Sequence, residues 1–288
     1  MNDAGTTIED RLRAGHETLT RAERQIAACL LENYPVSGLG SITTLAQAAE
    51  VSTPTVLRLV HKLGFDGFGA FQEALRGEVA ARMSGPIDKR AHSAGAAPSA
   101  HLLERFADRV RENLSGTLAQ IGAETFDTAA RRLADRDRRV HVTGGRITGA
   151  LADYLFTHLQ VIRPGVVQLG TAPGVWPHYL LDMAPGDVLV VFDIRRYETV
   201  LQRLAELAAD RGAEIVLFTD QWGSPVGRVA AHRFPCRVEA PSAWDSTVAI
   251  LAVLEALIAQ VQDLGWEDSR DRMETLETIF DDTRLFRK

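Results

Sequence analysis

Five side chains suited to binding DNA fall on one face of a short predicted helix. The helix begins at Ser52 or Thr53 and ends near Leu63, and its opposite face carries an apolar stripe. A start rich in hydroxyls and a basic exposed face suit a helix that enters the major groove. Hydroxyl and lysine side chains contact phosphates, and arginine pairs with guanine. The predicted DNA-binding residues are Thr53, Thr55, Arg58, His61 and Lys62.

The elements around this helix predict a helix-turn-helix. A shorter helix at 41–49 precedes it, and the two are separated by the turn Glu50-Val51-Ser52. An earlier helix at 19–33 starts with Thr20 and Glu23, which are spaced as a capping box. A fourth helix is expected at 68–83. By pattern alone, a solvated helical hairpin in a bundle is the alternative to DNA binding.

A second set of polar residues follows predicted strands in the C-terminal half. Glycines between a strand and a helix let backbone N–H groups approach an anion, and guanidinium groups pair with carboxylates and phosphates. The alternatives are a tight strand-to-helix connection, and an ion pair between Asp193 and one arginine that leaves the site altered or empty. The candidate ligand-binding residues here are Gly144, Gly145, Arg146, Thr148, Asp193, Arg195 and Arg196.

Five short apolar runs in this half predict a parallel sheet. They lack polar alternation, which is typical of strands covered by helices on both faces. The fold class is therefore an N-terminal all-α helix-turn-helix domain plus a C-terminal α/β domain with a parallel five-stranded sheet flanked by helices. The expected strands are 139–143, 166–169, 188–193, 214–219 and 233–238, and helices are expected at 102–121, 125–134, 148–160, 175–183, 198–210, 225–230, 246–264 and 267–280.

A stretch rich in Gly, Ala, Ser and Pro separates the two halves. We expect a helix-turn-helix domain at 1–83, a linker at 84–100, and an effector-binding and dimerisation domain at 101–288. The 288 residues suffice for two domains.

Composition narrows the class of protein. Hydrophobic residues make up 45% and charged residues 24%, as in ordinary globular proteins. The net charge of −6 argues against general coating of nucleic acid, and requires a local basic face for DNA binding. Cys29 and Cys236 form no disulfide framework, and we expect no metal and no cofactor. The sequence shows no signal peptide and no transmembrane run, so we expect a cytoplasmic protein without a membrane partner.

The N-terminal runs LTRAERQIAACLLEN (19–33) and VSTPTVLRLVHKLGFDGF (51–68) resemble the helix-turn-helix of RpiR/MurR-family transcription regulators. The resemblance covers about residues 15–82. It implies double-stranded operator DNA as a partner, and a homodimer or higher homo-oligomer that presents two recognition helices.

Residues 102–264 resemble a SIS (sugar isomerase) domain, the usual partner of that helix-turn-helix. The family motif G-x-G-x-S matches Gly144 to Thr148, with Arg146 in place of the second glycine, and S-x-S-G matches Asp193 to Arg196, where both serines are gone. A third family segment matches 241–246 and adds Ser242 to the candidate site. The family uses these hydroxyls to hold a sugar phosphate. An ionised Asp193 repels phosphate, whereas the three arginines attract it.

These observations favour a transcription regulator that senses a small anionic metabolite, either a sugar phosphate or another carbohydrate derivative, or a carboxylate. One alternative is a DNA-binding protein with a purely structural SIS dimerisation domain. A sugar-phosphate isomerase is the third reading, but the two loops supply no obvious base. Glu198 is nearby, and a carboxylate is ordinary where a helix opens. We therefore expect a non-enzyme.

Overall fold

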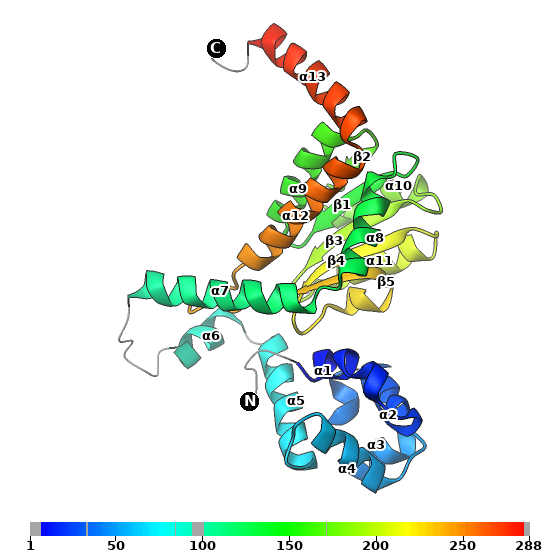
Figure 1. The fold of residues 1–288 in the computed structure, drawn as a ribbon, viewed down its shortest axis with the longest axis vertical. Helices are drawn as coiled ribbons and strands as arrows, with labels where there is room; N and C mark the ends of the chain where they lie inside the picture. The colour runs from blue at the N-terminus through cyan, green and yellow to red at the C-terminus, as the bar shows by residue number, and fades with distance from the viewer. Residues whose placement is uncertain (1–6, 33, 84, 94–100, 171, 285–288) are drawn as a thin grey trace. The chain divides into compact units, whose positions relative to one another are not determined.

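The computed structural model describes residues 7–32, 34–83, 85–93, 101–170 and 172–284, which divide into two compact units between residues 91 and 92 (Figure 1).

In the described residues of the N-terminal unit, every regular element is a helix. Leu45, Val56, Leu59, Phe71 and Leu75 are among the residues of its single core. The predicted helices are confirmed, and the predicted linker contains an additional short helix, α6. The elements are α1 (Ile8–Ala14), η1 (His16–Thr18), α2 (Arg21–Glu32), η2 (Val36–Gly38), α3 (Ile42–Ala48), α4 (Thr53–Lys62), α5 (Phe68–Met83) and α6 (Pro86–Ser93).

Local signals place the helix-turn-helix. The Thr20–Glu23 capping box forms, with the Thr20 N–H donating to Glu23 at 2.8 Å. Ser41 caps α3 by accepting from the Thr44 N–H. The chain turns between α3 and α4 with Glu50 in the left-handed region (φ 54°), and Gly64 adopts φ 88° just after α4. Glycine fits the positive φ at position 64 best, because it has no Cβ.

The C-terminal unit contains a five-stranded parallel sheet of order β2-β1-β3-β4-β5. β1, β3 and β4 are almost wholly buried. The apolar runs of β3 and β4 predict this burial, whereas β1 alternates apolar and polar residues and buries His141 and Thr143 as well. β5 alternates in exposure over its first half because it is an edge strand. The strands are β1 (Val140–Gly144), β2 (Val166–Gln168), β3 (Val188–Asp193), β4 (Glu214–Asp220) and β5 (Ala230–Cys236).

Helices cover both faces of this sheet. α10 and α11 form a core with apolar residues of β3 and β4, whereas α8, α9 and α12 contact one another and the sheet on the other side. The helix predicted at 225–230 is a single 3₁₀ turn, η4 (Pro225–Arg228). The remaining elements are α7 (Leu102–Gln120), α8 (Ala123–Ala134), α9 (Gly149–Ile162), η3 (Pro173–Val175), α10 (Trp176–Leu181), α11 (Thr199–Ala209), α12 (Val248–Leu264) and α13 (Trp266–Thr283).

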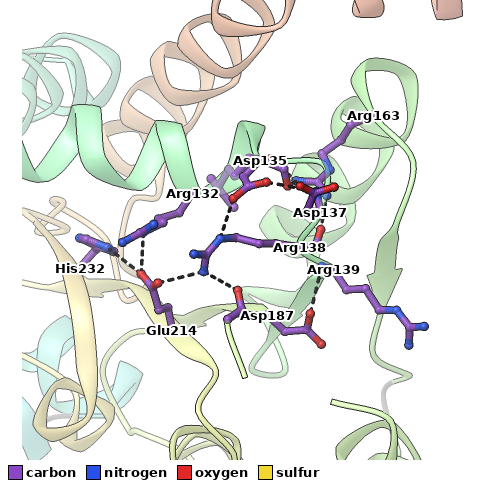
Figure 2. Close-up of polar contacts among 11 residues, drawn as sticks. Arg132, Asp135, Asp137, Arg138, Arg139, Arg163, Asp187, Glu214 and His232 are labelled. Carbon is purple, nitrogen blue, oxygen red and sulfur yellow. Dashed lines mark hydrogen bonds and ion pairs between the residues drawn. The ribbon is translucent and has the colours of Figure 1, made fainter. Parts of the chain in front are cut away.

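A charged network holds the amino ends of the strands (Figure 2). Arg138 bonds Asp135 at 2.8 Å and Glu214 at 3.0 Å, and Arg132 reaches the second oxygen of Glu214. Arg163 is fully buried and donates to the backbone carbonyls of Leu133, Asp135 and Arg138. Because these partners tie α8 to β1 and β4, we assign this network to the scaffold. The candidate ligand residues lie at the opposite, carboxyl edge.

Candidate functional site

The outward face of α4 carries the first candidate site. Arg58 and His61 are exposed, and Thr53 is half-buried at the start of the helix. Ser52 occupies the N-cap position but its side chain makes no capping bond. The first turn contains no acid, so the positive end of the helix stays available to a phosphate.

Thr55 was expected on this outward face and is instead buried, with only 8% of its surface exposed. Its Oγ1 accepts a hydrogen bond from Arg58 Nη2 at 2.9 Å and lies 2.9 Å from Ser52 Oγ. Thr55 therefore fixes the guanidinium of Arg58 and does not present its own hydroxyl. The 3.6-residue repeat places position 55 at the boundary of the apolar stripe, where neighbouring packing decides exposure.

Lys62 at the end of α4 is joined to α2. Its Nζ donates to the Thr18 carbonyl at 2.7 Å and to Glu23 Oε2 at 3.0 Å. Burial of Glu23 opposes ionisation, but hydrogen bonds from Thr20 and Lys62 outweigh it, so the pKa of Glu23 is lowered. Of the two permanent positive charges predicted on this face, Arg58 and Lys62, the charge of Lys62 is thus already balanced by Glu23. The capping-box position of Glu23 was the only sequence signal for this residue.

The second candidate site is the carboxyl edge of the sheet, where β1 turns into α9. The Thr148 hydroxyl accepts from the Gly145 N–H at 2.9 Å and donates to the Phe192 carbonyl at 2.7 Å, and its side chain is buried. A Cβ on Gly144 would lie 2.8 Å from the backbone of Thr148. Gly144 and Thr148 therefore shape the turn, with the Thr148 hydroxyl engaged inside the fold.

Glu198 occupies the turn in a way that the sequence did not reveal. Its Oε1 accepts the N–H of Arg146 at 2.8 Å, and a Cβ on Gly145 would come within 2.9 Å of the same oxygen. Glycine at 145 thus allows a carboxylate to approach the loop backbone closely. The loop has the geometry of an anion-binding turn, and the anion it holds is a side chain of this protein. The Arg146 side chain itself is exposed.

The sequence left open an ion pair between Asp193 and one of the arginines. Arg195 does form an internal ion pair, but its partner is Asp245 and not Asp193. Arg195 Nε lies 3.3 Å from Asp245 Oδ2, its side chain is only 6% exposed, and the guanidinium stacks 3.9 Å from the Trp222 ring centre. Arg196 behaves differently. It is exposed and adopts φ 63°, in the left-handed region.

Two buried carboxyl groups lie beneath this edge. Burial raises the pKa of Asp193 to about 7, although Ser224 and the Glu198 N–H donate to it. Burial also raises the pKa of Asp220, which accepts from the Arg195 N–H and the Tyr197 hydroxyl. Asp193 is thus partly protonated near neutral pH, which weakens the repulsion of an anionic ligand that its sequence position suggested.

Ser242 is half-buried, and its Oγ accepts from the Trp244 N–H at 3.1 Å within the loop before α12. Among the described residues no group of three or more side chains is arranged to hold a metal ion. In the same part of the chain no single helix is long and apolar enough to cross a membrane, and α12 with α13 reaches that criterion only together, across a 100° bend.

Comparison with known protein families assigns both units. The helix-turn-helix domain of the rpiR family matches residues 6–82, and the SIS domain matches residues 132–260. The transcriptional regulator HexR of Pseudomonas aeruginosa is 25% identical over 222 residues, which cover 77% of this chain and 75% of HexR. The bifunctional protein glk of Burkholderia mallei is 26% identical over 228 residues, but this chain spans only 33% of that protein.

Solved structures share the fold. The sugar isomerase domain of an RpiR transcription factor from Sphaerobacter thermophilus has a TM-score of 0.56 at 23% identity, covering 61% of this chain and 97% of that one. Vibrio vulnificus NanR complexed with ManNAc-6P has a TM-score of 0.56 at 18% identity, covering 97% of this chain and 99% of NanR. With a helix-turn-helix and a SIS domain in one polypeptide, the chain belongs to the RpiR family of transcriptional regulators.

Proposed function

We propose that this regulator binds operator DNA through α4 and that its SIS domain binds a small anionic metabolite that alters DNA affinity. The exposed guanidinium of Arg58, held by Thr55 on the outward face of α4, is the observation that carries the proposal. A fixed guanidinium suits paired hydrogen bonds to guanine. The protein would act on DNA in the cytoplasm as a homodimer or higher homo-oligomer, with two α4 helices about 34 Å apart.

For DNA contact, we assign base reading to Arg58 and phosphate contacts to Thr53, His61 and Lys62. Lys62 contributes less than an unpaired lysine because Glu23 already balances its charge. The unoccupied cap of α4 adds a backbone site for a phosphate.

A binding titration on the DNA upstream of the protein's own gene tests this assignment. Arg58→Ala is expected to weaken operator binding by about 1–3 kcal/mol and to relax base preference. The control is Arg76→Ala, which removes an exposed arginine that pairs with Glu73 on α5. Equal operator affinity for Arg58→Ala and the wild-type protein would contradict the assignment.

For the effector, we assign Arg146 and Arg196 at the carboxyl edge of the sheet as the groups that attract the anion. Both are exposed and both follow strands at the edge where ligands bind in parallel sheets. NanR, which shares this fold, was solved with a sugar phosphate. An anion that reached the backbone of the Gly144–Thr148 turn would have to displace the Glu198 carboxylate. A carboxylate or phosphate held by the two arginines alone would not.

Calorimetry with a panel of sugar phosphates and carboxylates tests the effector assignment. Arg146→Ala and Arg196→Ala are expected to weaken binding of any positive ligand, because each removes a charge-assisted contact. If a ligand binds both variants as tightly as the wild-type protein, its site lies elsewhere.

The second candidate is a SIS domain that serves only as a structural support for DNA binding. One observation favours it: the Thr148 hydroxyl, the Arg146 N–H and the Arg195 side chain are all engaged by groups of the protein itself. No heat of binding across the panel, together with normal operator binding, would support this candidate. An isomerase is disfavoured, because Glu198 is bound to the turn and Asp193 is buried.

A further inference from the structure

A carboxylate of the protein itself fills the turn between β1 and α9. Glu198 Oε1 accepts the N–H of Arg146 at 2.8 Å, and a Cβ on Gly145 would come within 2.9 Å of the same oxygen. The position from which an external anion would contact this backbone is therefore already taken. A ligand of the proposed effector site has to bind beside Glu198 or displace it.

Glu198 is kept close to the turn by its place in the fold. It occupies the N-cap position of α11, where its side chain makes no capping bond, and its N–H donates to Asp193 Oδ1 at 3.4 Å. From there α11 continues into the core, where Leu201 and Leu204 are buried. A group tethered in this way competes at an effective concentration on the order of millimolar, so a free anion displaces it only at a cost in affinity.

The other polar groups of the two loops, 144–148 and 193–198, offer little to a phosphate. The hydroxyl of Thr148 donates to the Phe192 carbonyl at 2.7 Å, and the hydroxyl of Tyr197 donates to Asp220 at 2.8 Å. A phosphate group presents three strong acceptor oxygens and is best held by several donors at once. The exposed side-chain donors of these loops are the two guanidinium groups assigned above to the effector.

The charges of the same loops favour a ligand with a single negative charge. Arg146 and Arg196 supply two positive charges, Glu198 supplies one negative charge, and Arg195 is already neutralised within its own ion pair. Burial raises the pKa of Asp193 to about 7, so this carboxyl adds only part of a negative charge near neutral pH. The small net positive charge that remains matches a carboxylate better than a phosphate ester, whose charge at pH 7 is about −1.5 to −2.

We propose that Glu198 determines the specificity of the effector site: it excludes phosphate from the turn and limits the effector to a carboxylate held by Arg146 and Arg196. The proposal rests on the effector site assigned above and narrows its ligand class. A carboxylate has two oxygens, which one guanidinium can bind together in a paired contact. It therefore needs neither the turn backbone nor the engaged hydroxyls, and Glu198 stays in place when it binds.

Titration of the full-length protein with inorganic phosphate, followed by phosphorus NMR, tests whether Glu198 closes the turn. Glu198→Ala is expected to bind phosphate about tenfold more tightly than the wild-type protein, because the tethered competitor is gone. Gly145→Ala added to Glu198→Ala places a methyl group beside the vacated position and should abolish the gain. Phosphate bound elsewhere, for example at α4, contributes equally to all of these proteins.

Asp210→Asn is the matched control, because it removes an exposed acid from the other end of α11 and should leave phosphate affinity unchanged. Glu198→Gln is a second variant that keeps the size of the side chain and removes its charge, and it should show a smaller gain than Glu198→Ala. Circular dichroism checks that both variants at 198 are folded.

The absence of a phosphate gain in both Glu198 variants would overturn the proposal, as would a gain that survives Gly145→Ala. A sugar phosphate that binds the wild-type protein as tightly as it binds Glu198→Ala would do the same. A failure of the effector assignment looks different. It would leave calorimetry unaffected by Arg146→Ala and Arg196→Ala, whereas the phosphate titration requires no identified effector.

Discussion

Among single residues, Lys62 shows how a partner from another helix changes the role of a side chain. On α4 it belongs to the predicted DNA face, but its ammonium group bonds Glu23 and the Thr18 carbonyl. The carboxylate of Glu23 also caps α2. One acid thus sets both the start of α2 and the charge available at the end of α4.

Glu23→Gln is expected to strengthen binding to nonspecific DNA. Glutamine can still fill the capping box, while the charge of Lys62 is released for a phosphate. The salt dependence of binding, measured by fluorescence anisotropy, should steepen by about 0.9 in log–log slope. In the double variant Glu23→Gln/Lys62→Ala, the slope should return to about the wild-type value. An unchanged slope in Glu23→Gln alone would show that Lys62 does not reach a phosphate.

Asp193 links the carboxyl edge of the sheet to pH. Its pKa in the folded protein is about 7, whereas the value for an unperturbed aspartate is 3.8. Between these values the folded state holds a proton that the unfolded state has released. The contribution of Asp193 to the stability of the folded state is therefore greatest at low pH and decreases as pH rises toward 7. Asp220, whose pKa is also raised by burial, adds to the same trend.

Asp193→Asn is expected to reduce this loss of stability. The free energy of unfolding of the wild-type protein should contain a contribution from Asp193 that falls by roughly 1 kcal/mol per pH unit between about pH 4 and 7. In Asp193→Asn this contribution disappears and that of Asp220 remains. Urea denaturation at several pH values measures the difference, and parallel pH profiles for the two proteins would contradict the assigned pKa.

At the scale of elements, the connection from β1 to α9 positions the candidate ligand site. Two glycines make this turn close, because Gly144 faces the backbone of Thr148 and Gly145 faces Glu198. Gly149, the first residue of α9, has no atom within 4 Å of the position where a Cβ would stand. The connection therefore contains two glycines at which a Cβ would meet close neighbours, and one at which it would not.

Gly144→Ala is expected to destabilise the C-terminal unit by about 1–3 kcal/mol, because the new methyl group meets backbone atoms that cannot rotate away. Gly149→Ala, the matched control, should be neutral or stabilise the protein by up to about 1 kcal/mol, since alanine favours the helix. Thermal unfolding followed by circular dichroism compares the two. Equal melting temperatures would show that the turn adapts at little cost.

At the scale of the whole molecule, the proposed function assigns DNA binding to the N-terminal unit and effector binding to the C-terminal unit. The N-terminal unit presents the outward face of α4, and the C-terminal unit presents the carboxyl edge of its sheet. If two chains associate, their α4 helices meet DNA together, and the spacing between half-sites becomes a property of the dimer.

Inserting five base pairs between the half-sites of an operator is expected to weaken binding strongly. Five base pairs rotate one half-site by about half a turn of the duplex, so two recognition helices no longer face the same side. Inserting ten base pairs should be tolerated better. Footprinting with the three spacings provides the measurement, and equal protection of all three would indicate that each chain binds alone.

The sequence by itself determined most of the elements and the presence of two units, although α1 and α6 were not predicted. Apolar runs without alternation predicted the buried strands β3 and β4, because strands covered on both faces favour apolar residues at successive positions. β1 is equally buried although its sequence alternates, and only the structure shows that His141 and Thr143 lie inside. The 3.6-residue stripe of α4 and the Thr20–Glu23 box placed the helix-turn-helix for similarly local reasons. The resemblance to the RpiR and SIS families rested on motifs inside these segments, and the family matches confirm it.

Only the tertiary structure decided which side chains remain available for function. Lys62 is joined to Glu23, 39 residues earlier, and the Arg146 N–H to Glu198, 52 residues later. Arg195 lies between Trp222 and Asp245. Periodicity fixes the direction in which a side chain leaves its own element, but its partner comes from whichever element the fold places beside it. The residue types at these sites could therefore be read from the sequence. Which of their charged and polar groups are already paired within the protein depends on packing between distant segments.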